Sequence, residues 1–448
     1  MGMHKSKIVC TALLAATLSA AAGPRIVDSE VEMAQDSGTR RVTVSYSLSG
    51  EPGIVTFSLQ TNSTESGWVD VGGEAVWRVY GDVNRVVTNT TSESSFTWIP
   101  DDTWPDKLIT DGSLRGVVKV WPTNDPPDYA VIEPNIKGGI SYYADAESVP
   151  GGVTNSVYKR NKFLMRRIHA TGARFTMGSP LDQSGDVVFK ETPHLVTLTN
   201  DFYIGVFEVT QDQFRLTETE WDLYFYFTNL PYSAELPLTG IDYVEIRGGS
   251  ASDGGLWSSN VSPSEGHKVA DGSFLWKLRA RTGVEFDIPT EAEWEFSCRA
   301  GKSSIIYNST LLTSDAASEI AWFAENSKSD DNSIAYPNDS YSRESGTLPR
   351  PVGLKKPNAW GLYDMLGNVS EWCLDYPELD FSGAHVTAPM GASSSYNSTS
   401  TKRIIRGGSH LTALGSLRTA ARSDTTVTSH KSFNGVRLTC PCPPNSKW

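Results

Sequence analysis

The chain has 448 residues, a formal net charge of −13 and five cysteines. One hydrophobic core rarely serves so long a chain, so we expect two or three domains. The acidic balance argues against nucleic acid and anionic lipid as partners, because both are recognised by clustered lysine and arginine side chains.

The first 23 residues have the three parts of a secretory signal peptide. Lys5 and Lys7 supply a basic start, an apolar run extends over residues 8–18, and small residues precede Gly23. The alternative, a membrane anchor, needs about 20 apolar residues, and this run is shorter. No later segment of the sequence is apolar enough to span a membrane. We therefore predict a cleaved signal peptide at residues 1–23 and a secreted or periplasmic protein.

The next part of the chain, residues 24–150, consists of short alternating runs. Residues 41–46, 53–58 and 116–121 alternate β-branched or aromatic side chains with polar ones. This period is typical of half-buried strands, and several such runs separated by turns predict an all-β sandwich of immunoglobulin or fibronectin type. The domain has no catalytic constellation, so it is either a spacer or an adhesion module. Residues 151–162 are the predicted linker, because the turn-forming sequence Pro150-Gly151-Gly152 lies at their start.

After residue 163 the sequence changes to short strands and helices joined by long loops, which predicts an α+β domain. Thr290 followed by Glu293 is a capping box, so a helix is expected to begin there. Three later arginines are expected to pair with buried carboxylates or carbonyls: Arg406, Arg418 and Arg437.

Two carboxylates, Asp364 and Glu371, lie close together in a turn-rich segment. An oxygen-rich loop of this kind suits a hard cation such as Ca²⁺, to which the intervening backbone carbonyls can also bind. The same two residues could equally be a turn anchor and a surface charge. The spacing alone leaves both possibilities open.

Several motifs occur in a characteristic order. They are residues 175–179 (FTMGS), 201–210 (DFYIGVFEVT), 288–296 (IPTEAEWEF), 357–369 (PNAWGLYDMLGNV), and a closing set at 405–409 (IRGGS), 417–423 (LRTAARS) and 434–438 (NGVRL). Together they resemble the formylglycine-generating, sulfatase-modifying factor family, whose core is C-type-lectin-like. The resemblance extends over about residues 163–440 and implies that fold there, followed by a tail at residues 441–448.

The resemblance also implies a structural calcium ion, held in the family by two side chains and two backbone carbonyls. The matching positions in this chain are Asp364, Gly367, Val369 and Glu371. Ser370 stands where family members usually have an aromatic side chain.

The family oxidises a cysteine of an unfolded sulfatase with molecular oxygen, and two cysteines after the Gly-Gly-Ser turn hold copper(I). Soft thiolates bind copper(I), whereas hard oxygen ligands do not. Here the turn is residues 407–409, the first of the two positions is Thr412, and no cysteine lies between Cys373 and Cys440. The second position falls near Leu417 or in a short deletion. We therefore predict that copper is not bound.

The other cysteines suggest structural roles. Under the resemblance, Thr419 replaces the disulfide partner of Cys298, which leaves that residue as a buried thiol. A disulfide between Cys373 and Cys440 or Cys442 is expected in preference to a redox role, because an exported protein meets oxidising conditions.

Little else in the sequence indicates a catalytic or metal-binding site. Ser409 and His410 could be a nucleophile and its base, yet neighbours in sequence seldom point at each other, and no acidic partner is identifiable. The other histidines have no ligand spacing along the sequence: His169, His194, His267, His385 and His430.

Three hypotheses remain. The chain could be a formylglycine-generating oxidoreductase that acts on exported sulfatases, against which the missing thiols weigh. It could be a binding module whose groove near Ser409, His410, Thr412 and Arg422 takes a peptide, protein or glycan. It could also be a structural or adhesive protein that uses the fold as a rigid platform. We expect the second or third.

Overall fold

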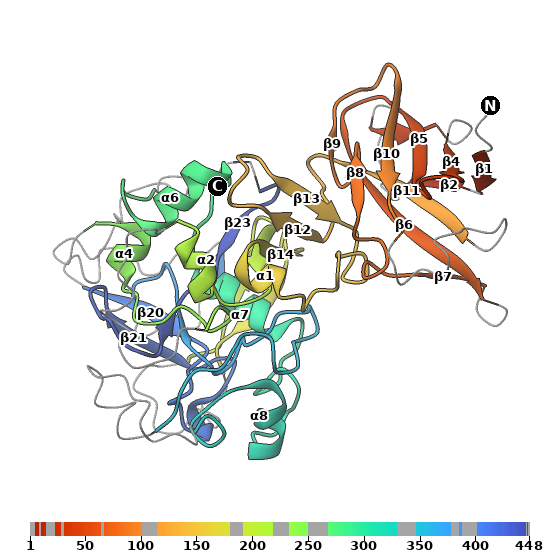
Figure 1. The fold of residues 1–448 in the computed structure, drawn as a ribbon. Helices are drawn as coiled ribbons and strands as arrows, with labels where there is room; N and C mark the ends of the chain where they lie inside the picture. The colour runs from red at the N-terminus through yellow and green to blue at the C-terminus, as the bar shows by residue number, and fades with distance from the viewer. Residues whose placement is uncertain are drawn as a thin grey trace. The chain divides into compact units, whose positions relative to one another are not determined.

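The computed structural model describes residues 5–8, 10–14, 23–27, 31–63, 67–100, 114–179, 191–217, 233–249, 268–328, 346–377, 385–387, 401–444 and 446. The chain divides into two compact units, which Figure 1 shows in colours that run from red to blue along the chain. Unit 1 contains residues 1–131 and 140–155, and unit 2 contains residues 132–139 and 156–448. No helix among the described residues is long and apolar enough to cross a membrane.

Unit 1 is built from β-strands in two main sheets. The first sheet has the order β1 (Lys5–Ile8), β4 (Glu32–Asp36), β5 (Val42–Ser49), β10 (Glu93–Trp98) and β8 (Val79–Gly81), with β3 (Arg25–Ile26) beside β5. The second has the order β2 (Cys10–Leu14), β11 (Leu114–Pro122), β6 (Gly53–Ser63) and β7 (Gly67–Asp70), with β9 (Arg85–Val87) beside β6. Strands β12 (Tyr129–Ile132) and β13 (Ile140–Tyr143) follow along the chain.

The two sheets of unit 1 share one hydrophobic core. In β5 the side chains of Val42, Val44 and Tyr46 are buried, as the alternating pattern predicts. They belong to the same core as Phe57 of β6 and Val118 of β11. This part of the chain is therefore all-β, and its assignment to the immunoglobulin or fibronectin type stays a prediction. Within the predicted signal peptide, β1 pairs with β4 and β2 pairs with β11; the signal peptide also stays a prediction.

Unit 2 combines short helices with three groups of strands, as expected for an α+β domain. The helices are α1 (Val157–Arg160), α2 (Gln211–Arg215), α4 (Tyr243–Arg247), α6 (Phe274–Thr282), α7 (Glu291–Arg299) and α8 (Ser314–Ile320), and a 3₁₀ turn, η4, spans Leu414–Ser416. Strands β14 (Phe163–Ile168), β17 (Phe202–Gly205) and β23 (Thr439–Pro441) are neighbours in one sheet. A second sheet has β15 (Arg174–Met177), β16 (His194–Thr197) and β19 (Val386–Thr387). The third has β21 (Arg422–Thr426), β20 (Lys402–Arg406), β18 (Ser370–Trp372) and β22 (Asn434–Gly435), in this order.

Helix α7 begins where the sequence predicts. The hydroxyl of Thr290 accepts a hydrogen bond from the Glu293 amide at 3.2 Å, and the Glu293 carboxylate accepts one from the Thr290 amide at 2.9 Å. Helices α2 and α4 begin with the same reciprocal arrangement. Such short helices gain little from propagation, so these side chains stabilise them by satisfying amides that have no partner within the helix.

The core of unit 2 brings together segments that are far apart in the sequence. Trp294 of α7 is fully buried in it, together with Met365, Ile404 of β20 and Leu417. This core therefore holds α7, the loop around residue 365 and β20 in one rigid group. Of the predicted site residues, Ser409, His410 and Thr412 follow β20, whereas Arg422 begins β21 and Glu371 lies in β18.

Candidate functional site

A cavity of about 490 Å³ lies beside β20 and β21. Ser409, Thr412 and Arg422, three of the four residues predicted at the site, line it. The fourth, His410, is fully buried, and its Nδ1 atom lies 3.1 Å from the hydroxyl of Thr347. Further lining residues include Ser370, Ile405, Leu411, Ser416, Ser423 and Phe433. Hydroxyl groups and apolar side chains thus make up most of the cavity wall, together with Arg406 and Arg422.

The hydroxyl of Thr412 belongs to the turn that forms one edge of this cavity. It accepts a hydrogen bond from the Ser409 amide at 2.8 Å, while the Thr412 amide donates to the Ser409 carbonyl at 2.9 Å. Gly407 and Gly408 have φ of 88° and 72°, which suits glycine, and a Cβ on Gly408 would lie 2.9 Å from the Thr412 hydroxyl. Thr412 therefore stabilises the turn at the position where the family resemblance implies a thiolate.

The four cysteines whose side chains the structure describes are all thiols, which corrects the expected disulfide between Cys373 and Cys440 or Cys442. Cys373 follows β18 and Cys440 lies in β23, and these strands belong to different sheets. Burial raises the pKa of the Cys373 and Cys440 thiols, as it does for Cys298. These three thiols are protonated at neutral pH and so are poor nucleophiles and poor metal ligands. Among the described residues, no cysteine lines the cavity.

Thr419 forms local contacts in place of the disulfide that the resemblance implies for its position. Its hydroxyl donates to the carbonyl of Ile305 at 3.1 Å, and its amide donates to the same carbonyl at 2.9 Å. The Sγ atom of Cys298 lies 3.8 Å from the Met365 carbonyl. The prediction that Cys298 is a buried thiol is confirmed.

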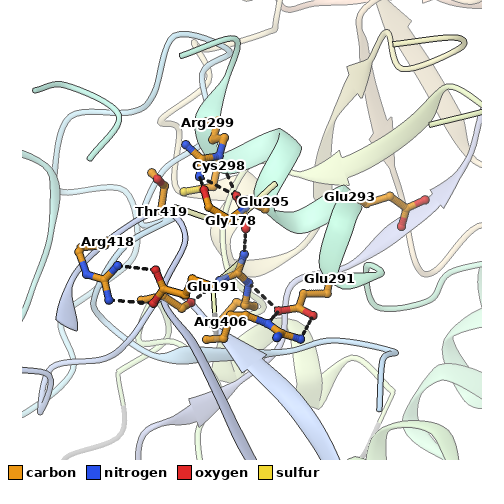
Figure 2. A network of polar contacts seen from close by, with 12 residues as sticks. Gly178, Glu191, Glu291, Glu293, Glu295, Cys298, Arg299, Arg406, Arg418 and Thr419 are labelled. Atoms are coloured by element: carbon orange, nitrogen blue, oxygen red, sulfur yellow. Dashed lines mark hydrogen bonds and ion pairs between the residues drawn. The ribbon is translucent and has the colours of Figure 1, made fainter. Parts of the chain in front are cut away.

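Helix α7 supplies two carboxylates that neutralise the arginines at the cavity, and Figure 2 shows Arg406 beside them. Arg422 donates from Nε and Nη2 to the two carboxylate oxygens of Glu291 at 2.6 and 2.7 Å. Arg406 forms an ion pair with Glu295, and its Nε lies 3.4 Å from Glu291 Oε1. All four side chains are almost fully buried. The cavity therefore offers no uncompensated guanidinium from these two arginines to a ligand.

The same network extends to the loops around α7. Glu295 also accepts hydrogen bonds from Arg299 and from the Gly178 amide, the latter at 2.8 Å. Arg418 donates to both carboxylate oxygens of Glu191 at 2.5 and 2.8 Å. The prediction that Arg406 and Arg418 pair with buried carboxylates is thus confirmed, and the paired arginines fix the loops that surround the cavity.

A buried carboxyl group, Asp375, lies behind the first turn of α7. Its Oδ2 atom accepts a hydrogen bond from the Glu291 amide at 2.6 Å. Burial, together with the negative charge of Glu291, raises the pKa of Asp375 to about 8. The folded protein therefore holds a proton on Asp375 at a pH at which the unfolded chain has lost it.

This proton makes stability depend on pH. An unfolded aspartate has a pKa of about 3.9, so the folded state binds more protons between about pH 4 and pH 8, and stability falls as pH rises through this range. Asp375→Asn keeps an oxygen that can accept from the Glu291 amide but carries no charge. We expect the stabilisation of α7 by this change to be larger at pH 8 than at pH 5 by more than about 1 kcal/mol, because the penalty in the unchanged chain grows with each pH unit. Hydrogen exchange of the α7 amides measures the difference, and equal effects at both pH values would contradict this account.

The segment predicted to bind calcium is a tight turn beside this network. Asp364, Gly367 and Asn368 all have positive φ, of 54°, 79° and 57°. The Oδ2 atom of Asp364 accepts from the Gly353 amide at 2.7 Å. Its Oδ1 atom is buried and has no hydrogen-bond partner among the described residues. That oxygen is therefore available to a cation.

The other predicted side-chain ligand, Glu371, is already engaged. Its carboxylate accepts from Nε and Nη2 of Arg437 at distances between 2.7 and 3.0 Å, and from Nε1 of Trp294 at 2.6 Å. The prediction that Arg437 pairs with a buried carboxylate is confirmed.

Glu208 is a further buried acid at this turn, which the sequence reasoning missed. It accepts from the Asn368 side chain at 2.6 Å and from the Val369 amide at 3.2 Å. Burial and the charges of Asp364 and Glu371 raise its pKa, whereas Arg437 opposes that shift. The signal that could have identified it is a single acid within the apolar run Val206-Phe207-Glu208-Val209.

Comparisons with known proteins find sequence relatives of this chain. The chaperone protein LppX of Paenibacillus barcinonensis is 29% identical over 185 residues, which are 40% of this chain and 64% of that protein. The formylglycine-generating enzyme of Thermomonospora curvata is 28% identical over 195 residues, 42% of this chain and 59% of that enzyme. The chain thus spans less than two thirds of the length of either relative.

Solved structures and family models extend the comparison. The structure of PvdO from Pseudomonas aeruginosa matches with a TM-score of 0.45 and 18% identity, over 62% of this chain and 94% of that one. The model of the sulfatase-modifying factor enzyme 1-like domain matches residues 156–440. Because this match covers more than half of the chain, the protein belongs to the sulfatase-modifying factor family of formylglycine-generating-enzyme-like proteins.

Proposed function

We propose that unit 2 binds a peptide segment in the cavity beside β20 and β21 and does not oxidise it to formylglycine. The observation that carries this proposal is the Thr412 hydroxyl, which is hydrogen-bonded within the turn where the family resemblance implies a copper(I) ligand. A neutral hydroxyl does not bind copper(I) as a thiolate does.

The lining of the cavity supports a peptide as the ligand. Hydroxyl groups such as those of Ser409 and Ser423 can hydrogen-bond to a peptide backbone, and Leu411 and Phe433 offer apolar contact to its side chains. Arg406 and Arg422 are neutralised by glutamates, so they do not select a strongly charged ligand. Relatives named as a chaperone and as formylglycine-generating enzymes are compatible with peptide recognition.

The test uses two peptides, one with the sequence Cys-x-Pro-x-Arg and one with serine in place of cysteine. We expect the full chain to bind both with similar affinity, because no metal–thiolate bond forms. With copper(I) and oxygen, mass spectrometry is expected to detect no aldehyde in the cysteine peptide. Aldehyde formation would show that the chain is the oxidoreductase instead, and failure to bind either peptide would refute the binding role.

A matched pair of variants locates the binding site. Ser416 lines the cavity and has an exposed side chain, so Ser416→Trp fills the space without disturbing the core. We expect this change to weaken peptide binding at least about tenfold, which corresponds to about 1.4 kcal/mol. Ser303 is also exposed and does not line the cavity, so Ser303→Trp is expected to leave binding unchanged. Equal effects of the two variants would place the peptide elsewhere.

We also propose that the chain is exported through the signal peptide at residues 1–23. The basic start, short apolar run and small residues before Gly23 support this proposal. Expression in a secreting host followed by N-terminal sequencing of the exported protein is the test. A retained N-terminus on the mature protein would contradict cleavage.

We further propose that Ca²⁺ binds at the turn of Asp364, Gly367, Val369 and Glu371. Support comes from the buried Oδ1 of Asp364 and from three buried carboxylates, Glu208, Asp364 and Glu371, that gather around the single guanidinium of Arg437. A hard cation with oxygen ligands would balance this excess of negative charge.

Saturating calcium is expected to raise the melting temperature of unit 2 by about 5 °C or more, because binding at 100 times Kd contributes about 2.7 kcal/mol. Calorimetry of the chelator-treated chain with and without CaCl₂ measures this shift. Asp364→Asn removes the charged ligand and should abolish it. An unchanged melting temperature would rule out the calcium site.

A further inference from the structure

Three side chains with metal-binding atoms meet away from the cavity. Asp242 precedes α4, Glu245 lies in its first turn, and His430 follows β21. The Nε2 atom of His430 lies 3.4 Å from Asp242 Oδ2 and 3.2 Å from Glu245 Oε1. One ligand atom from each residue lies within 4.8 Å of the others. The sequence gives no metal-ligand spacing for His430, because the fold alone brings it to these acids.

The capping box of α4 orients both carboxylates toward the histidine. Asp242 Oδ1 accepts from the Glu245 amide at 2.7 Å, and Glu245 Oε2 accepts from the Asp242 amide at 3.0 Å. Each carboxylate thus uses one oxygen for the backbone and presents its other oxygen to His430. Outer hydrogen bonds of this kind commonly fix the direction of metal ligands.

The backbone also fixes the loop that carries His430. The Val244 amide donates to the Val427 carbonyl at 3.3 Å, and the Gly240 amide donates to the Lys431 carbonyl at 3.1 Å. These bonds lie on either side of His430 in the sequence. The imidazole is therefore held against the start of α4 without depending on its own contacts with the two acids.

The distances between the ligand atoms match metal coordination. Zinc binds nitrogen and oxygen ligands at about 2.0–2.2 Å, so two ligands of a tetrahedral ion lie about 3.3–3.5 Å apart. A direct charge-assisted hydrogen bond between an imidazolium and a carboxylate is shorter, at about 2.7–2.9 Å. The two separations from His430 are 3.4 and 3.2 Å, which a tetrahedral ion can span, and without a metal ion His430 hydrogen-bonds to Glu245.

We propose that Asp242, Glu245 and His430 bind a divalent cation of the zinc class. One imidazole nitrogen with two carboxylate oxygens is a ligand set that suits Zn²⁺ or Co²⁺ better than the all-oxygen preference of Ca²⁺. The side chain of Asp242 is 6% exposed and that of His430 is 33% exposed, so the site opens on the histidine side. Solvent or a small anion can complete the coordination there. This site is independent of the proposed peptide cavity.

The full chain, freed of metals by a chelator, is titrated with ZnCl₂ in the presence of excess CaCl₂, and binding is followed by calorimetry. We expect one zinc ion per chain. Asp242→Asn combined with Glu245→Gln keeps the acceptors of the capping box but removes both charges, and His430→Ala removes the nitrogen ligand. Each is expected to weaken zinc binding at least about tenfold, or about 1.4 kcal/mol.

His169→Ala is the matched control, because His169 is an exposed histidine that lies 3.6 Å from a single carboxylate, Asp201. It should bind zinc as the unchanged chain does. The visible absorption of bound Co²⁺ provides a second readout. It should be lost in His430→Ala and kept in His169→Ala. Absence of zinc binding by the unchanged chain, or wild-type binding by His430→Ala, would overturn the proposal.

Discussion

Replacing Arg437 by methionine is expected to destabilise unit 2 by about 3–5 kcal/mol, the cost of breaking a buried ion pair by removing one partner. The Arg437 side chain is fully buried and pairs with Glu371, which is itself 1% exposed. Its guanidinium also donates to the carbonyls of Gly205, Val206 and Tyr363. Methionine fills much of the volume but leaves the carboxylate of Glu371 and these carbonyls without their donor.

Hydrogen exchange of the β18 and β20 amides measures this loss in the full chain, because a chain with two units need not unfold in one step. The control is Lys356→Met, which breaks the exposed pair with Glu319, where both side chains are more than half exposed. That change is expected to cost no more than about 1 kcal/mol. Adding Glu371→Gln to Arg437→Met should restore part of the stability, since it removes the unpaired charge. Equal losses in the Arg437 and Lys356 variants would refute this account.

Gly367→Ala is expected to destabilise unit 2 by about 2–5 kcal/mol. Part of this cost, about 1–2 kcal/mol, arises because φ at Gly367 is +79°, which a residue with a Cβ adopts poorly. The rest, about 1–3 kcal/mol, is overpacking, because the added Cβ would lie 2.2 Å from the carbonyl oxygen of Trp322. The backbone of this turn would have to move, and with it the neighbouring Asn368, whose amide donates to the same carbonyl at 2.7 Å.

A substitution at Gly301 distinguishes the conformational cost from the cost of overpacking. Its φ is also +79°, but a Cβ there would meet nothing within 4 Å. Gly301→Ala is therefore expected to show only the conformational cost of about 1–2 kcal/mol. Thermal unfolding of both variants, each compared with the unchanged chain, provides the measurement. If Gly301→Ala destabilises as much as Gly367→Ala, contact with Trp322 does not contribute.

Local rules were sufficient for several features of unit 2. The capping box of Thr290 and Glu293 starts α7 as predicted, because it involves only neighbouring residues and their amides. The arginine predictions were correct for a similar reason: a long cationic side chain in a buried motif must meet an acid or a carbonyl. The sequence could not say which acid each arginine meets. Arg418 pairs with Glu191, whereas Arg406 and Arg422 pair with the acids of α7.

The cysteines show where sequence reasoning failed. Neither the spacing of cysteines along the sequence nor an oxidising compartment establishes whether two sulfur atoms come within bonding distance. That distance depends on which sheets carry the two residues. Cys373 and Cys440 lie in or beside strands of different sheets, and the four cysteines with described side chains are all thiols. The expected disulfide was therefore wrong, although the prediction of a buried thiol at Cys298 was right.

The amino-acid sequence alone was enough to identify the family, the start of α7 and the absence of a cysteine between Cys373 and Cys440, because each of these depends on residue identity and short-range order. Three other features became visible in the folded chain alone: the Thr412 hydroxyl supports the turn at the cavity, Glu208 lies with Asp364 and Glu371, and His430 lies beside Asp242 and Glu245. These contacts join residues from separate loops. Packing of the shared core, rather than any local pattern, sets the distances between them.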